Sequence, residues 1–152
     1  MTNSNTPVTI GVIYRPPSGD IDKALIELSE ILDILPKNSY IGGDFNIDLL
    51  KDNHKYIEEF EEVTMSRGFY PLISTITHEK PGCSGSCIDN FITNDIEKVL
   101  ISGTIDDKIS HHFPIFQIFE TNLKPIQNED KHTQFYDYCN SNIEKFTDQL
   151  DH

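Results

Sequence analysis

The sequence predicts a layered α/β domain, and three observations support this fold class. The first half alternates strand-like and helix-like segments, while the second half consists mostly of short strand-like runs between polar turns. A length of 152 residues suits one ordinary domain, or a piece of a larger one. A hydrophobic fraction of 37%, with nine Phe and six Tyr, is enough to build a core.

The first three predicted elements form a strand–helix–strand unit. Val8 to Tyr14 is a β-branched run that we expect to be a buried strand, stopped by Pro-Pro. The next segment predicts a helix with Asp20 as its N-cap and Pro36 beyond its end. Its apolar residues recur at helical spacing: Ala24, Leu25, Leu28, Ile31, Leu32 and Leu35. The run SYIGGDFNIDLL then predicts a short strand that enters a turn around Asp44 to Asn46.

The remaining elements are one helix and four strands. The second amphipathic helix spans roughly residues 54–67 and is closed by Gly68. The strand-like runs are YPLIST, CIDNFITND, KVLISGTI and FPIFQIF. We expect residues 8–120 to form the domain and the polar residues 121–139 to form a linker. Residues 140–152 predict a terminal helix, capped by Asn140 or Ser141.

The charge of the chain restricts its function. The net charge is −13, from 25 acidic and 12 basic residues, which argues against a basic nucleic-acid-binding module. Clustered carboxylates suit divalent cations, however, and a cation can bring a phosphate with it. A metal-dependent phosphodiesterase is therefore compatible with the composition. No run approaches the ~18 apolar residues of a membrane span, and no secretory signal is evident, so we expect no membrane partner.

The cysteines indicate a reducing, intracellular location. There are three, an odd number with no disulfide framework. His78, Cys83 and Cys87 lie close together in HEKPGCSGSC, but zinc usually requires four ligands and the spacing matches no common zinc motif. We interpret this segment as a polar loop, with a zinc site as the less favoured alternative.

Polar residues stand at the ends of apolar strands in four stretches, namely IYRPP, GGDFN, CIDNF and SHHFPIF. Side chains at such positions emerge from a rigid sheet, where functional groups are often held. The residues concerned are Tyr14, Asp44, Asn46, Asp89, His111 and His112. Each alone has an ordinary structural explanation, such as packing, turn formation or hydrogen bonding at a sheet edge.

Taken together and in this order, these motifs resemble the endonuclease/exonuclease/phosphatase superfamily. They are most similar to the apurinic-type endonuclease domain of non-LTR retrotransposons. The resemblance runs from about Thr9 to Leu150 and rests on IGVIYRPP, GGDFNIDLL, SRGFYPLI, IDNFITND and HFPIFQIF. It implies a layered α/β sandwich of the deoxyribonuclease-I-like type and metal-dependent hydrolysis of DNA phosphodiesters. The tail NIEKFTDQL resembles the segment that leads toward a reverse transcriptase.

The resemblance also implies roles for the matching residues. Asp44 would orient or deprotonate the attacking water, and Asn46 would bind the phosphate beside it. Tyr14 would contact the scissile phosphate. The cofactor would be Mg²⁺ or Mn²⁺. Fixed donors and a cation suit this reaction because the pentacoordinate phosphate gathers negative charge.

The histidine half of the implied site comes from the last two motifs. His112 matches the catalytic histidine, which would touch the phosphate, and Asp89 matches its carboxylate partner. A carboxylate is needed there to hold the tautomer of the imidazole. Thr77 matches a supporting, substrate-binding hydroxyl less closely.

The chain departs from the family pattern in two places. The family has Ser-Asp-His where this chain has Ser110-His111-His112. His111 therefore replaces a metal-site carboxylate, and imidazole suits Mg²⁺ less well than oxygen does. The strands that carry an Asn and a metal-binding Glu are also expected upstream, so the domain looks N-terminally truncated. A truncated sandwich should expose apolar sheet faces, which predicts a protein partner or self-association.

Three functions stay open at this point. The first is a DNA endonuclease domain of retrotransposon origin, impaired by truncation and by His111, and located in the nucleus. The second is a catalytically inactive remnant that acts as a binding or interaction module. The third, which the retrotransposon-like motifs disfavour, is a superfamily phosphatase that acts on lipids or small molecules.

Overall fold

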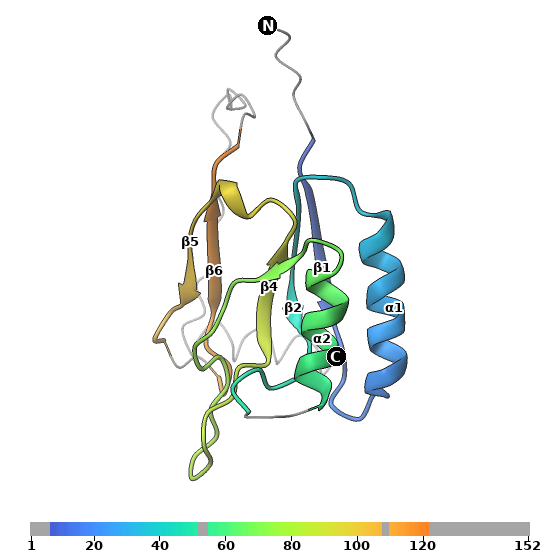
Figure 1. The fold of residues 1–152 in the computed structure, drawn as a ribbon. Coiled ribbons are helices and arrows are strands. Elements are labelled where there is room, and N and C mark those ends of the chain that lie inside the picture. Colours follow the sequence, from blue (N-terminus) through green and yellow to red (C-terminus); the bar gives the residue numbers. More distant parts are fainter. Residues whose placement is uncertain (1–6, 52–54, 108–109, 122–152) are drawn as a thin grey trace, which may run out of the picture.

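The computed structural model describes residues 7–51, 55–107 and 110–121. Figure 1 shows the elements in chain order: β1 (Thr9–Tyr14), α1 (Ile21–Ile34), β2 (Ser39–Asp44), α2 (Lys55–Met65), β3 (Tyr70–Pro71), β4 (Asp89–Thr93), η1 (Ile96–Lys98), β5 (Val99–Thr104) and β6 (Ile115–Phe119). All but Thr121 of the predicted linker, and the whole predicted terminal helix with Asn140 and Ser141, lie outside the described residues.

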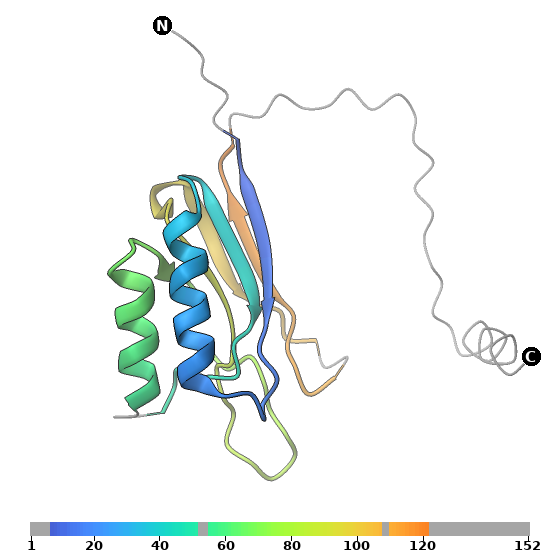
Figure 2. The same cartoon turned by 90° about the vertical axis from the view of Figure 1, so that its right-hand side faces the viewer.

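The strands form two sheets. Four strands pair in the order β1-β2-β4-β3, with β1 parallel to β2 and the other pairs antiparallel. β5 and β6 form a separate antiparallel pair, which lies beside β4 in Figure 1. The two helices cover one face of the four-stranded sheet, as the view in Figure 2 shows. On the opposite face, the rings of Tyr40 and Phe119 stack at a centroid distance of 3.9 Å and join the two sheets.

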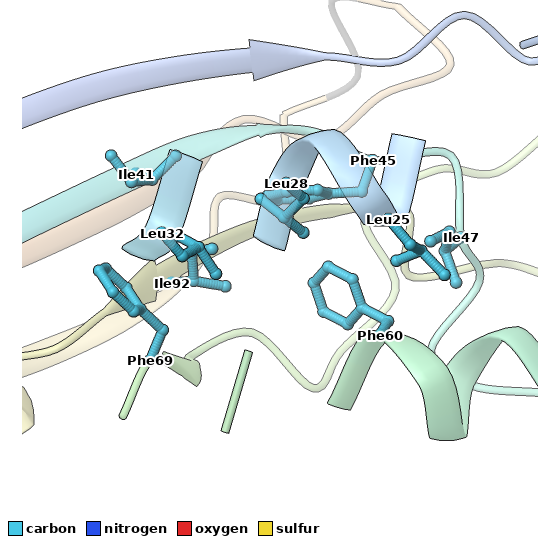
Figure 3. Packing of buried hydrophobic residues seen from close by; sticks show 9 residues of the cluster. All are labelled: Leu25, Leu28, Leu32, Ile41, Phe45, Ile47, Phe60, Phe69 and Ile92. Atoms are coloured by element: carbon cyan, nitrogen blue, oxygen red, sulfur yellow. The ribbon is translucent and has the colours of Figure 1, made fainter. Parts of the chain in front are cut away.

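The core lies between the two helices and the four-stranded sheet. Asp20 caps α1 as predicted, since its side chain accepts a hydrogen bond from the Lys23 amide. Nine buried apolar residues form the core cluster drawn in Figure 3: Leu25, Leu28, Leu32, Ile41, Phe45, Ile47, Phe60, Phe69 and Ile92. Phe60 is 0% exposed and packs edge-on against Phe45. The apolar stripe of each helix therefore faces the sheet, as the sequence predicts.

The prediction that the first strand is buried was wrong. Burial alternates along β1, and the outward side chains of Ile10, Val12 and Tyr14 are 73%, 85% and 67% exposed. The reason is that β1 is an edge strand with helices on one face only, so every second side chain points away from the core. Ile31, expected on the buried face of α1, is also exposed.

Two element lengths also differ from expectation. The second helix ends at Met65, followed by a turn in which Gly68 has a φ of +73°. The strand predicted over YPLIST is only Tyr70–Pro71. The Leu72 amide still donates to the Phe91 carbonyl of β4, but the Ile73 amide donates to the side-chain oxygen of Asn90 and no longer to the main chain of β4. In the described part of the chain, no helix has the length and apolar character of a membrane span.

Candidate metal and phosphate site

Three of the predicted site residues form a row across the sheet. β1 ends at Tyr14, β2 ends at Asp44 and β4 begins at Asp89, and the strand register places Tyr14 opposite Asp44 and Asp44 opposite Asp89. The core residue Ile41 faces the helices. Side chains alternate between the two faces of a strand, and Asp44 comes an odd number of residues after Ile41, so Asp44 faces away from the helices. The row therefore opens on the sheet face that the helices leave free.

Two glycines allow the strands to approach closely just before Asp44. A Cβ atom on Gly43 would lie 1.8 Å from the main-chain oxygen of Ile13 in β1. A Cβ atom on Gly42 would lie 2.5 Å from the ring of Phe91 in β4. The Gly-Gly pair of the GGDFN motif thus sets the spacing of the three strands that carry the row.

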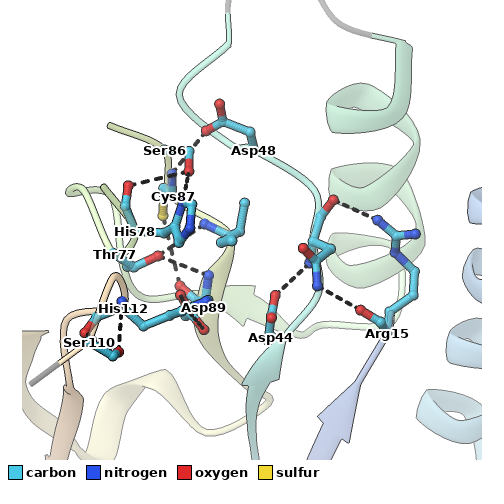
Figure 4. A network of polar contacts seen from close by, with 12 residues as sticks. Arg15, Asp44, Asp48, Thr77, His78, Ser86, Cys87, Asp89, Ser110 and His112 are labelled. Atoms are coloured by element: carbon cyan, nitrogen blue, oxygen red, sulfur yellow. Dashed lines mark hydrogen bonds and ion pairs between the residues drawn. The ribbon is translucent and has the colours of Figure 1, made fainter. Parts of the chain in front are cut away.

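A group of two carboxylates and one imidazole, from Asp44, Asp89 and His112, stands at the centre of the site, and we call it the metal-ligating group. Asp44, Asp89 and His112 each offer one ligand atom within 4.8 Å of the others. His112 Nδ1 lies 3.2 and 3.0 Å from the two carboxylate oxygens of Asp89, as Figure 4 shows. In the tautomer with Nδ1 protonated, Nδ1–H donates this hydrogen bond to the Asp89 carboxylate, which leaves Nε2 of His112 for another partner. Two carboxylates beside an imidazole fit a divalent cation of the Mg²⁺ or Mn²⁺ type.

The segment that carries His112 is held by main-chain pairing with residues 77–79. The Phe113 amide donates to the Thr77 carbonyl at 2.7 Å, and the Glu79 amide donates to the His111 carbonyl at 2.8 Å. Ser110 Oγ accepts a hydrogen bond from the His112 amide. These bonds bring the imidazole to β4 although it comes from a distant part of the chain.

Thr77 supports the carboxylate of the pair. Its side chain is 0% exposed, and its Oγ1 accepts hydrogen bonds of 3.0 Å from the amides of both Ile88 and Asp89. The hydroxyl therefore fixes the main chain at the start of β4, where the Asp89 carboxylate emerges. Its burial under Asp89 suits this supporting role, while contact with substrate stays a prediction.

Replacing Thr77 with Val is expected to destabilise the protein by about 1–3 kcal/mol, because it leaves the partly buried amides of Ile88 and Asp89 without this acceptor. The isosteric methyl group adds no volume. Urea unfolding would measure the change in the free energy of unfolding, and Thr75→Val, at an exposed threonine, is the matched control. Equal effects of the two substitutions would contradict the assignment of Thr77 as the support of Asp89.

Asn46 stabilises the turn that follows Asp44. Its amide donates to Asp44 Oδ1 at 3.0 Å, and its backbone adopts a φ of +50°, a conformation that Asn tolerates better than most residues. Its side-chain Nδ2 donates to the Arg15 carbonyl at 2.7 Å. Asn46 therefore borders the metal-ligating group and orients Asp44; the phosphate contact stays a prediction.

The electrostatics of the site favour different protonation states at neighbouring groups. Burial raises the pKa of Asp44, and the nearby Asp89 carboxylate raises it further, against the lowering effects of the Asn46 amide and His112. The pKa of His78 is lowered, mainly by burial and then by His112 and Lys80. Its ring lies 4.7 Å from that of His112.

The other predicted ligands lie outside this group. His111 is exposed, and its ring lies 6.5 Å from the ring of His78. Of the residues that the structure describes, those whose ligand atoms gather closely are Asp44, Asp89 and His112, so His111 as a metal ligand stays a prediction. Cys83 is exposed, whereas Cys87 is fully buried with its pKa raised to about 11, and neither forms a described zinc group with His78.

Sequence reasoning missed two residues that border the site, Arg15 and His78. His78 was considered only as a zinc ligand, although its main chain pairs with that of His112. Arg15 stands in the IYRPP stretch but was not singled out there, although it is 8% exposed and contacts the turn after β2. One signal in the sequence could have indicated Arg15, because it directly follows Tyr14, the predicted site residue that ends β1.

The comparisons with known proteins identify the fold. No protein-family model matches the chain, and no curated protein matches it either. Among solved structures, the endonuclease domain of TRAS1, a telomere-specific non-LTR retrotransposon, aligns with a TM-score of 0.58 and 17% identity, over 67% of this chain and 51% of that one. An endonuclease/exonuclease/phosphatase family protein from Leptotrichia buccalis C-1013-b aligns with a TM-score of 0.47 and 22% identity, over 63% and 42%.

The TRAS1 alignment confirms the predicted fold class, the layered α/β fold of the deoxyribonuclease-I-like type. The chain spans about half the length of the solved endonuclease domain that it matches. At this level of identity the likeness is one of fold, and it agrees with the resemblance that the motifs predict.

Proposed function

We propose that the chain is part of a metal-dependent DNA endonuclease of the endonuclease/exonuclease/phosphatase superfamily, of retrotransposon origin. The observation that carries this proposal is the convergence of Asp44, Asp89 and His112, with ligand atoms within 4.8 Å, in a fold shared with the TRAS1 endonuclease domain. Because a retrotransposon endonuclease acts on chromosomal DNA, we place the proposed activity in the nucleus.

The carboxylates of Asp44 and Asp89 would hold the cation, Mg²⁺ or Mn²⁺. When bound, it would supply positive charge to the phosphate and increase the acidity of water. Asp44 would then orient the attacking water and accept its proton. His112 points Nε2 at a phosphate oxygen, since Asp89 holds Nδ1. Tyr14, at the end of the same row, would donate a hydrogen bond from its hydroxyl to the phosphate.

The proposed activity is weak in this chain. His111 stands where the resemblance implies a metal-site Asp, so one hard oxygen ligand is replaced by an imidazole. Mn²⁺, which accepts nitrogen ligands more readily than Mg²⁺ does, is the better cofactor for such a site.

Nicking of supercoiled plasmid DNA by the purified chain, with Mg²⁺ or Mn²⁺, tests the proposal. The variants are Asp44→Ala and His111→Asp, beside the unchanged protein. We expect slow nicking that Asp44→Ala abolishes and His111→Asp accelerates by about tenfold or more, as for restoring a group in the metal shell. Nicking that survives Asp44→Ala would contradict the proposed role of this carboxylate.

A catalytically inactive binding module is the second candidate. The observation that favours it is the size of the metal-ligating group. Among the described residues it offers three clustered ligand groups, which are few for a cation that prefers six oxygens. The same experiment distinguishes the two functions, because retention of DNA with no nicking by any variant supports the binding module.

We further propose that another polypeptide packs on the open face of β1. The outward side chains of Ile10 and Val12 are mostly exposed, and β1 has no partner on its outer edge among the described strands. Since Tyr14 continues the same face, this polypeptide would border the metal-ligating group.

The chain on its own is therefore expected to self-associate through this face. Size-exclusion chromatography with light scattering would measure the mass, and Val12→Lys, at a position that is 85% exposed, should restore the monomer by placing a charge on the edge strand. Ile96→Lys, at an exposed apolar position outside β1, is the control. A stable monomer with cooperative melting before any substitution would count against the open face as an interface.

A further inference from the structure

Arg15 lies between the end of β1 and the turn that carries Asp44. Its amide donates to the Asp44 carbonyl at 2.9 Å and so extends the pairing of β1 with β2 by one residue. The residue is 8% exposed although it carries a charge. In the ranges that the structure describes, Arg15 forms no ion pair. A buried guanidinium without a carboxylate requires other acceptors, because an unsatisfied buried charge is costly.

Main-chain carbonyls supply these acceptors, and two of them belong to the turn after Asp44. Arg15 Nε donates to the Phe45 carbonyl at 2.7 Å, and Nη2 donates to the Asn46 carbonyl at 2.6 Å. Nη1 donates to the carbonyls of Gly19 at 2.8 Å and Pro16 at 3.2 Å. The planar guanidinium of arginine thus binds two turns at once, residues 16–19 after β1 and residues 44–46 at the end of β2, and lysine has no such fork of donors.

Asn46, in the same turn, donates hydrogen bonds both to Arg15 and to Asp44, and so connects the two residues. Asn46 Nδ2 donates to the Arg15 carbonyl at 2.7 Å, and the Asn46 amide donates to Asp44 Oδ1 at 3.0 Å. Figure 4 shows this network beside the Asp89–His112 pair. The left-handed backbone of Asn46, although Asn tolerates it better than most residues, is less favourable than in glycine, and these contacts help to maintain it.

We propose that Arg15 is a positioning residue of the candidate site: its carbonyl-bonded guanidinium fixes residues 44–46 so that the Asp44 carboxylate stays in register with Asp89 and His112. The inference rests on the proposed function for its catalytic meaning. The positioning itself depends only on the contacts of Arg15 with the turn.

The test compares Arg15→Lys with Arg67→Lys in the full chain. Arg67 is the other arginine, and its fork also binds carbonyls and a carboxylate, but on α1 and α2 rather than at the site. Lysine keeps the charge and loses the fork. Two readouts are used: hydrogen exchange of the Asn46 amide without metal, and Mn²⁺ affinity from electron paramagnetic resonance, both well below the melting temperature of each variant.

We expect Arg15→Lys to speed exchange of the Asn46 amide about tenfold and to weaken Mn²⁺ binding about tenfold or more. Arg67→Lys should change neither quantity. Unchanged Asn46 exchange in Arg15→Lys would overturn the proposal. If the unsubstituted chain binds no Mn²⁺, the proposed function fails, while the exchange rate still decides the role of Arg15. Should Arg15→Lys not fold, Arg15→Gln, which keeps one pair of donors, is measured in the same way.

Discussion

Replacing Asp44 with Asn is expected to lower the rate of nicking by about 10²–10⁴-fold. The same substitution should raise the free energy of unfolding at neutral pH. The first effect follows because a neutral amide can neither accept a proton from water nor pair with a cation as a carboxylate does. The amide oxygen can still accept the hydrogen bond from the Asn46 amide, so the turn should keep its conformation. The substitution therefore isolates the charge of Asp44.

The gain in stability follows from the direction of the pKa shift. Because the pKa of Asp44 is raised in the folded state, the folded protein binds the proton more tightly than the unfolded chain does. The stabilising contribution is present below the ordinary pKa of Asp and is lost as the pH rises through the raised value. Asn carries no charge at any pH, so the variant should be more stable than the unsubstituted protein at neutral pH and equal to it in acid.

Thermal unfolding at neutral pH and at low pH would measure this difference, and isothermal titration with Mn²⁺ would measure the loss of binding. Asp48→Asn is the matched control, because Asp48 accepts hydrogen bonds from the Leu50 and Cys87 amides and lies outside the metal-ligating group. If Asp44→Asn destabilised the protein at neutral pH, the carboxylate would have a structural role that the desolvation argument omits.

Replacing Phe60 with Ala should have the largest effect on stability, a loss of about 3–5 kcal/mol. Phe60 is fully buried between α2 and the sheet and contacts the Phe45 ring edge-on at a centroid distance of 5.2 Å. Its removal leaves a cavity next to the first residue of the turn that follows Asp44. Since small domains are stable by about 5–15 kcal/mol, a large part of the population could unfold.

Urea unfolding gives the comparison, with Ile34→Ala as the control. Ile34 is also an apolar helical residue but is 81% exposed, so its truncation should change stability by less than about 0.5 kcal/mol. The dependence of the free energy on urea should be equal in both variants, which shows that the unfolded states are comparable. Equal losses of stability would contradict the location of the core between the helices and the sheet.

Local signals in the sequence were sufficient for most elements of the fold. The Asp20 cap and the Gly68 turn involve neighbouring residues only, so both were predictable. The exposure of β1 was not predictable, because a β-branched run is compatible with a central strand or an edge strand. Whether a run becomes a central strand or an edge strand depends on the strand order, and the strand order depends on pairing between distant segments of the chain.

The site shows the same limit. Asp44, Asp89 and His112 were predicted from motifs, and the structure brings them together. The contribution of Arg15 was missed because its partners are main-chain carbonyls, which every residue has and no motif records. Only the conformation of the 44–46 turn makes those carbonyls converge on one side chain.

The parallel pairing of β1 with β2 also bears on the order of events in folding. These strands are consecutive and joined by α1, so they can pair as soon as both have been synthesised, at a small cost in loop entropy. His112 is held beside Asp89 by the pairing of the segments around residues 78 and 112, and the second of these segments comes near the end of the described chain. During synthesis, the segments that carry Asp44 and Asp89 therefore precede the imidazole, and the metal-ligating group is completed only when the segment with His112 has been added.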